Sequence, residues 1–164
     1  MSQDITKRPQ TTGEEIANTI SHGIGALLAA VGGIPLVIKG VMAGSAKAGA
    51  SLTFYAITLV LLYTASAVYH GVRNPELKRV LRVMDHCSIF LLILGTYVPL
   101  SLLVVGGRTG WALFLTNTAL AVVGITLNAI SLTRFDKISL VLYALMGWLV
   151  VLALRTILQV LAPA

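Results

Sequence analysis

Charged residues are scarce in this sequence. Only 11% of its 164 residues are Asp, Glu, Lys or Arg, whereas 57% are hydrophobic and the mean hydropathy is +0.89. Soluble domains carry about a quarter charged residues, so the composition excludes that class and predicts a membrane protein. Cysteine is nearly absent as well. With Cys87 alone, no intrachain disulfide can form, and nothing indicates an oxidising compartment.

Acidic residues are the rarer charged type. Six acidic residues against twelve basic ones leave a formal net charge of +6. An excess of basic residues is typical of nucleic-acid binding, but these Lys and Arg residues stand singly or in small groups between apolar runs. We therefore expect them to set the membrane topology, and we expect no nucleic-acid partner.

A cleavage site for a signal peptide is also missing. The first fifteen residues are polar, and no small-residue motif follows the first apolar run. We therefore expect no cleaved leader. Residues 1–15 are predicted to form a polar cytoplasmic tail, and the hydrophobic segment after them is predicted to remain in the membrane.

Long apolar segments dominate the rest of the chain. A bilayer core about 30 Å thick requires roughly 20 apolar residues per helix. Five segments meet this requirement: 16–38, 51–70, 85–105, 111–132 and 138–158. No water is available in the bilayer core to satisfy an irregular backbone, so each segment must be helical. The sequence predicts an all-α polytopic membrane protein, with residues 16–164 as a transmembrane bundle and stretches such as 133–137 as loops.

The positions of Lys and Arg predict the orientation of this bundle. With the N-terminus inside, the cytoplasmic segments contain Lys7, Arg8, Arg73, Lys78, Arg79, Arg82, Arg134 and Lys137. The opposite side contains Lys39, Lys47 and Arg108, with Arg155 near the outer end of the last helix. Basic residues are retained on the cytoplasmic side, so the N-terminus is predicted to be cytoplasmic and the C-terminus external.

Polar side chains occur at the ends of three predicted helices, which this topology places at one membrane face. Ionisable groups in a membrane span are costly and rare, and they indicate a functional site by default. The candidates lie at spacings of four residues on the first two helices and at the start of the third: Glu14, Asn18, His22, Ser66, His70, Asp85 and His86. They predict one polar site at the cytoplasmic end of the bundle.

The residue types of this set are those of a hydrolytic zinc centre. A catalytic zinc site has about three protein ligands and an open position for water. In this interpretation His70 is a ligand, Asp85 holds or deprotonates the zinc-bound water, and Ser66 orients the groups around it.

Plainer interpretations stay open for these residues. A histidine at a helix end, such as His70, can lie in the headgroup layer without a chemical role. Asn18 and His22 can hydrogen-bond across helices and hold the bundle together. His86 projects about 100° away from Asp85 on a helix, which argues against a joint role. The metal motifs HExxH and CxxC, which would favour zinc independently, are absent.

Four stretches of the sequence together resemble the bacterial hemolysin III family, a branch of the progestin and adipoQ receptor superfamily. They are EEIANTISHG at 14–23, SAVYH at 66–70, RVMDHCSIF at 82–90 and GTYVP at 95–99. The resemblance covers nearly the whole chain. It implies a seven-helix fold in the bacterial inner membrane, with a cytoplasmic N-terminus and a zinc site near the cytoplasmic side.

The resemblance also assigns roles to residues. It implies that His70 is the zinc ligand from the second helix, that Asp85 holds the zinc water and that Ser66 lies beside them. The family supplies two further ligands from an HxxxH pair on its seventh helix, whereas this sequence has no histidine beyond His86 and ends after five predicted helices. We therefore expect a C-terminally short chain that carries one of the three histidine ligands and binds zinc weakly.

The function that the resemblance implies is zinc-dependent hydrolysis of a membrane lipid, since family members with known chemistry are similar to lipid amide hydrolases such as ceramidases. The alternative is a non-enzymatic membrane activity: pore formation and lysis, or a receptor-like role in membrane homeostasis. A transporter is a weaker third hypothesis, because broken helices and repeat symmetry are not evident in the sequence.

Overall fold

A computed structural model describes residues 10–161, and within this range the chain is helical and contains no strand. Its elements are α1 (Thr12–Met42), α2 (Ala46–Gly71), α3 (Pro75–Pro99), η1 (Leu100–Val105), α4 (Gly107–Ile130), α5 (Leu132–Trp148), η2 (Leu149–Ala153) and α6 (Leu154–Leu161). Five helical stretches of this part are long and apolar enough to cross a membrane, the last running through α5, η2 and α6. The predicted all-α polytopic membrane fold is confirmed. Most of the predicted polar tail, residues 1–9, lies outside the described range.

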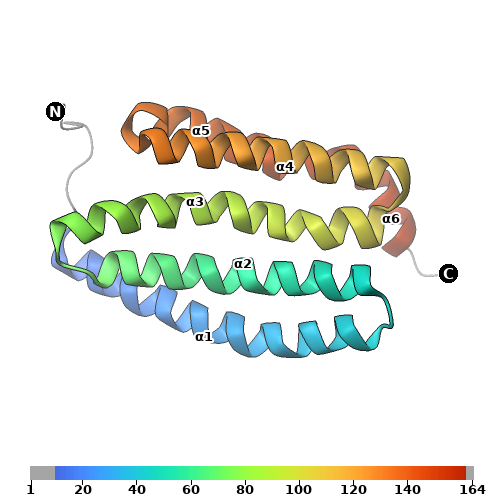
Figure 1. The fold of residues 1–164 in the computed structure, drawn as a ribbon, viewed down its shortest axis with the longest axis horizontal. Helices are drawn as coiled ribbons and strands as arrows, with labels where there is room; N and C mark the ends of the chain where they lie inside the picture. The colour runs from blue at the N-terminus through green and yellow to red at the C-terminus, as the bar shows by residue number, and fades with distance from the viewer. Residues whose placement is uncertain (1–9, 162–164) are drawn as a thin grey trace.

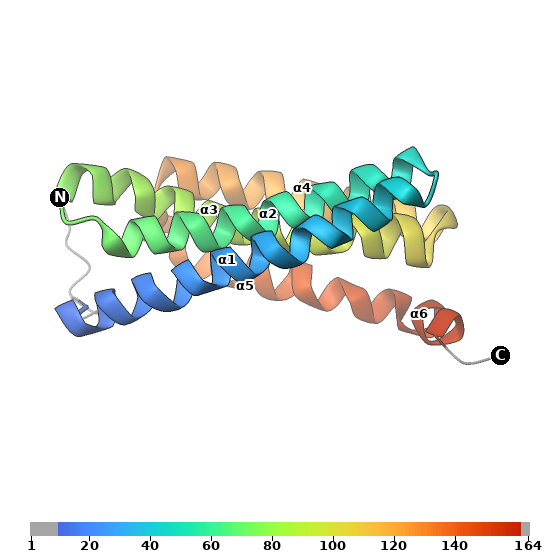
Figure 2. The ribbon, with the colours of Figure 1, turned by 90° about the horizontal axis from the view of Figure 1, so that it is seen from below.

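The helices run alternately up and down and pack mainly on their neighbours in sequence. α1 packs on α2, α2 on α3, α3 on α4 and α4 on α5, while α5 also contacts α3 (Figures 1 and 2). One end of the molecule therefore holds the start of α1, the end of α2 and the start of α3 (Figure 1, left). This is the end at which the sequence places most of its polar candidates.

Several helices begin earlier than predicted, because polar caps extend them beyond their apolar segments. α1 begins at Thr12 rather than 16, since the Thr11 hydroxyl accepts from the Glu14 N–H and the Glu14 carboxylate accepts from the Thr11 N–H. α3 begins at Pro75 rather than 85, since the Asn74 side chain caps its first turn. A hydropathy threshold does not detect such caps.

The connection between α4 and α5 is also shorter than predicted. The interpretation of 133–137 as a loop is wrong, because these residues form the first turns of α5. Ser131 alone separates the two helices, and its hydroxyl accepts from the Arg134 N–H. The charges in this stretch lie in the first turns of α5 and do not interrupt the helix.

Two interruptions of regular α-helix occur on the side of the bundle away from the polar end. After Pro99 the hydrogen bonding widens to a π-helical turn, in which the Gly106 N–H donates to the Ser101 carbonyl at 2.9 Å. The second interruption lies in the last span, where the hydroxyl of Tyr97 on α3 contacts the backbone. This hydroxyl accepts from the Val150 N–H at 2.7 Å and donates to the Gly147 carbonyl at 2.9 Å. The Tyr97 side chain thus replaces a backbone hydrogen bond of this helix, which explains the 3₁₀ segment at η2.

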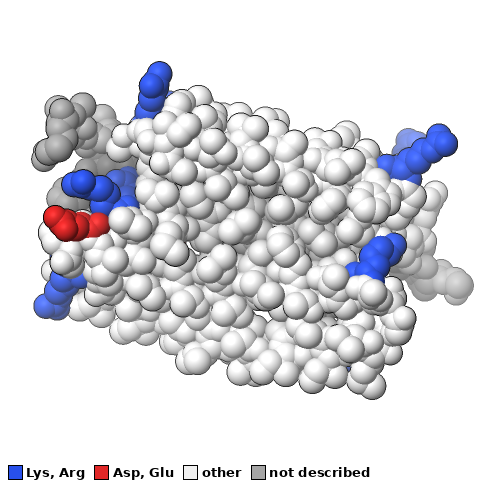
Figure 3. Space-filling view, in the orientation of Figure 1, with Lys and Arg blue, Asp and Glu red and all other residues white. Residues whose placement is uncertain are grey.

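The charge distribution over the surface is that expected of a membrane span. Lys and Arg lie at both ends of the molecule, Asp and Glu at the left end only, and the band between the ends carries none of them on the face shown (Figure 3). Large apolar side chains of α1, such as Leu27, Leu28 and Val31, are about two-thirds exposed in this band. The buried core is small and lies between α3, α4 and α5, around Phe90 and Met146.

Candidate functional site

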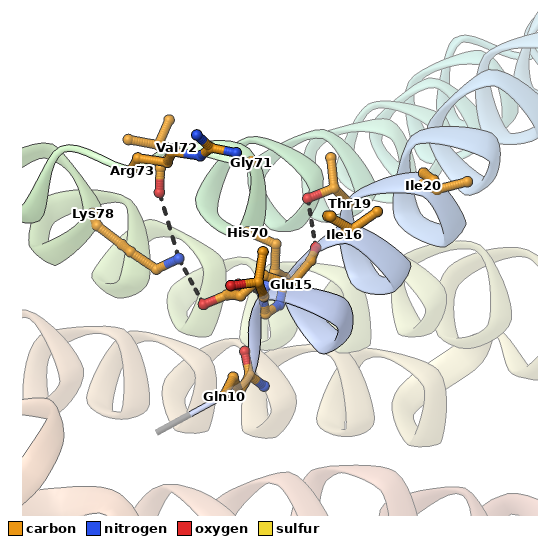
Figure 4. A pocket seen from close by; sticks show the side chains of 11 residues that line it. Gln10, Glu15, Ile16, Thr19, Ile20, His70, Gly71, Val72, Arg73 and Lys78 are labelled. Atoms are coloured by element: carbon orange, nitrogen blue, oxygen red, sulfur yellow. Dashed lines mark hydrogen bonds and ion pairs between the residues drawn. The ribbon is translucent and has the colours of Figure 1, made fainter. Parts of the chain in front are cut away.

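Glu15 joins the first three helices at the polar end. Its carboxylate lies between α2 and α3, with Oε2 2.7 Å from Nδ1 of His70 and Oε1 2.7 Å from Nζ of Lys78 (Figure 4). The imidazole of His70 is only 9% exposed, so it points inward rather than into the headgroup layer. The end of α2 and the start of α3 therefore converge through an ionic contact with α1.

A second polar contact lies next to this one. Nδ1 of His22 on α1 is 2.5 Å from the hydroxyl of Ser66 on α2, which is buried. The rings of His22 and His70 meet edge to face with their centroids 6.0 Å apart, and Tyr63 contacts His22 in the same manner. The seam between α1 and α2 thus contains two histidines, each hydrogen-bonded across the helix pair.

The ammonium group of Lys78 is fixed from several sides. Besides Glu15, it donates to the carbonyl oxygen of Val72 at 3.4 Å, and it lies 5.2 Å from the ring centroid of Tyr69. The Tyr69 ring in turn contacts that of His70. The three-residue connection after α2 is short enough to bring the first turn of α3 back onto the end of α2. We call Glu15, His22, Ser66, His70 and Lys78 the polar cluster.

A cavity of about 570 Å³ opens beside the polar cluster at the end of the bundle. Glu15, His70 and Lys78 form part of its wall, and Figure 4 shows them meeting at the mouth of the α1–α2 seam. Apolar side chains, Ile16 and Ile20, form another part of the wall. The cavity is therefore amphipathic.

Two of the predicted site residues lie apart from the polar cluster. The Asp85 carboxylate is 3.5 Å from Nδ1 of His86, and that nitrogen is 2.9 Å from the Arg82 carbonyl, to which it can donate. Within residues 10–161, no hydrogen bond or ion pair links Asp85 to His70 or to Ser66. His86 lines a different cavity, together with residues of α4 and α5. The structure thus brings His22, Ser66 and His70 together in the polar cluster and leaves Asp85 and His86, which contact each other, outside it.

The first helix presents Glu15 to the seam in place of the predicted Glu14. Glu14 belongs to the capping box of α1, and Asn18 lines a separate shallow pocket with Glu14. Helical spacing alone could have indicated Glu15, since it precedes His22 by seven residues and therefore lies on the same face of the helix. The spacing i, i+4, i+8 drifts around a helix, whereas seven residues make almost two full turns. No comparable sequence signal indicates Lys78.

The described residues do not form a complete zinc site. Among residues 10–161, no three His, Cys, Asp or Glu side chains are grouped closely enough to hold a metal ion. His70 has the chemistry of one ligand, because Glu15 engages its Nδ1 and leaves Nε2 without a partner in this range. His22 directs Nδ1 to Ser66 instead. These residues fit one ligand position of a metal centre and not a tetrahedral set.

Apolar in its middle and charged at its ends, the molecule is a polytopic α-helical membrane protein whose polar cluster lies where α1 starts and α2 ends. The chain belongs to the haemolysin-III-related family, whose model matches residues 10–164. It is similar to Hemolysin-3 of Bacillus cereus, with 37% identity over 155 residues that cover 94% of this chain and 71% of that protein. It is also 37% identical to the Hemolysin-3 homolog of Bacillus subtilis (strain 168) over 145 residues, 88% of this chain and 68% of the relative. No solved structure matches the chain significantly.

Proposed function

We propose that this membrane protein acts on a membrane lipid as a zinc-dependent hydrolase of the lipid amide type, with the polar cluster as part of its active site. The observation that supports this proposal is the Glu15–His70 pair. A carboxylate on one imidazole nitrogen is the usual partner of a metal-binding histidine, because it orients the ring and directs the other nitrogen outward. His70 is proposed as one zinc ligand, and the remaining ligands are not among the described residues.

Within this proposal the other residues keep distinct roles. Ser66, held by His22, is buried beside His70 and is proposed to orient the polar part of the substrate. Asp85 is proposed to assist proton transfer. Because its side chain makes no contact with His70 or Ser66 here, this role requires the start of α3 to move relative to α2. Zinc, when bound, would polarise a carbonyl and supply an activated water.

Metal binding by the purified protein tests the proposal directly. We expect added zinc to bind weakly, because one histidine ligand is present, and we expect His70→Ala to abolish this binding. Glu15→Gln should weaken it by about 10-fold or more, the usual effect of removing a partner of a metal-bound histidine. His86→Ala, a histidine outside the polar cluster, is the matched control. Equal zinc content in the native protein, His70→Ala and His86→Ala would exclude the metal site.

We also propose that the polar cluster faces the cytoplasm in the bacterial inner membrane. The support is the uneven distribution of Lys and Arg, which are more numerous beside the start of α1, the α2–α3 connection and the α4–α5 connection. A lipid processed at this site would come from the inner leaflet.

A second candidate function is membrane lysis, which the names of both relatives favour. No zinc is required for that activity. Release of a trapped dye from vesicles, unchanged by a chelator and by His70→Ala, would support lysis and contradict the hydrolase. Product release from a lipid amide, lost with the chelator and with His70→Ala, would have the opposite meaning.

A further inference from the structure

The cavity at the polar end combines basic groups and apolar walls at the ends of the first two membrane-spanning helices. Lys78 and Arg73 line it from the start of α3 and from the α2–α3 connection, while Ile16 and Ile20 line it from α1. Its volume of about 570 Å³ is within the range of small-molecule sites. An occupant that satisfies both walls must be amphipathic and must carry negative charge at its polar end.

The basic groups retain capacity to bind such an occupant. An ammonium group has three N–H donors, and Lys78 uses two of them, toward Glu15 and Val72. The guanidinium of Arg73 has five donors and no hydrogen-bond or ion-pair partner among residues 10–161. Glu15 neutralises only one of the two cations. The cavity therefore has a net positive charge and several donors available for the oxygens of a phosphate.

The apolar wall continues from the cavity along α1. Ile16, Ile20, Ile24 and Leu27 are each more than half exposed, and they follow one another on one side of the helix. The rise from residue 16 to residue 27 is about 16 Å at 1.5 Å per residue. One leaflet of a bilayer core about 30 Å thick has nearly the same depth, about 15 Å. An acyl chain can therefore lie along this wall from the interface to the bilayer centre.

We propose that this cavity is a binding site for an anionic phospholipid of the leaflet at the polar end. Its phosphate contacts Arg73 and Lys78, and an acyl chain lies on the apolar side of α1. The site shares His70 with the proposed hydrolase, but the inference concerns binding alone. A protein that binds this lipid without cleaving it satisfies the inference, so the failure of hydrolysis would leave it intact.

Native mass spectrometry of the purified full chain tests the proposal, with phosphatidylglycerol and phosphatidylcholine as separate probes. We expect tighter binding of the anionic lipid and about a fivefold loss of affinity for it in Arg73→Gln. Arg79→Gln is the matched control, because it removes the same charge from an exposed residue of the same surface that does not line the cavity. An equal loss of affinity in Arg73→Gln and Arg79→Gln, or equal binding of the two lipids, would overturn the proposed site.

Two further measurements distinguish a site for a lipid from a site for a free anion. Ile20→Asn places a polar group on the apolar wall and should weaken phosphatidylglycerol binding while leaving every cationic group in place. Inorganic phosphate should not displace the lipid at equal concentration, because it gains nothing from the apolar wall. Full displacement by phosphate, together with unchanged lipid binding in Ile20→Asn, would show an anion site and refute the phospholipid.

Discussion

At the scale of single residues, two adjacent glutamates have unrelated tasks. Glu14 closes the capping box of α1, and Glu15 joins α1 to His70 and Lys78. One residue changes the direction of a helical side chain by about 100°, so Glu15 reaches His70 across the seam while Glu14 turns back to Thr11 on its own helix. The position of a carboxylate on the helix, and not its presence in a polar stretch, decides which of the two can serve the site.

A double-mutant cycle on the folded protein tests this division. Glu15→Gln and Lys78→Gln should show a coupling of about 0.5–1 kcal/mol in the free energy of unfolding in mixed micelles, as expected for a pair that is partly exposed. Glu14→Gln paired with Lys78→Gln is the control and should show none. Equal coupling in the two cycles would contradict the register of α1 in the structure.

At the scale of helices, close approach depends on glycines that face a neighbouring helix. Gly124 on α4 faces the ring of Phe90 on α3, and a Cβ added there would overlap the ring. Phe90 is fully buried, so the ring has no free space to enter. Gly32 on α1 has no atom of a neighbouring helix within 4 Å of an added Cβ. Glycine therefore has a packing role at position 124 and none at position 32.

Gly124→Ala should accordingly destabilise the protein by about 1–3 kcal/mol, the usual cost of overpacking a core. Gly32→Ala should be neutral or stabilising by up to about 1 kcal/mol, because alanine favours a helix over glycine. Thermal unfolding in one detergent measures both. If the two variants melted at the same temperature, the contact between α3 and α4 would not be as described.

At the scale of the whole molecule, the up-and-down order places three distant sequence segments at one end. The start of α1, the end of α2 and the start of α3 supply Glu15, His70 and Lys78. Basic residues are concentrated at the same end, which supports our proposal that this end faces the cytoplasm.

Cysteine labelling tests this orientation. In a Cys87→Ala background, Ala43→Cys lies in the α1–α2 connection and Glu76→Cys lies at the opposite end, in the first turn of α3. An impermeant maleimide added to right-side-out vesicles should label Ala43→Cys at once and Glu76→Cys only after permeabilisation. The reverse pattern would place the polar cluster outside the cell.

The sequence by itself determined the membrane class and the number of spans among the described residues, because hydropathy is summed over about 20 residues and needs no partner. It also indicated His22 and His70, since ionisable groups in apolar helices are rare, and it indicated Ser66 by its spacing of four residues from His70. It did not locate helix starts such as Pro75, which depend on one capping side chain.

Only the tertiary structure decided which polar groups meet. The contacts of Glu15 with His70 and Lys78 span 55 and 63 residues, and they depend on the rotation of three helices about their axes. The predicted topology suggested Asp85 for this site, because it places the start of the third helix at the same membrane face as His70, but the Asp85 carboxylate contacts His86. Helix rotation is set by packing against neighbours, and a periodic sequence pattern constrains it too loosely to choose between residues one position apart.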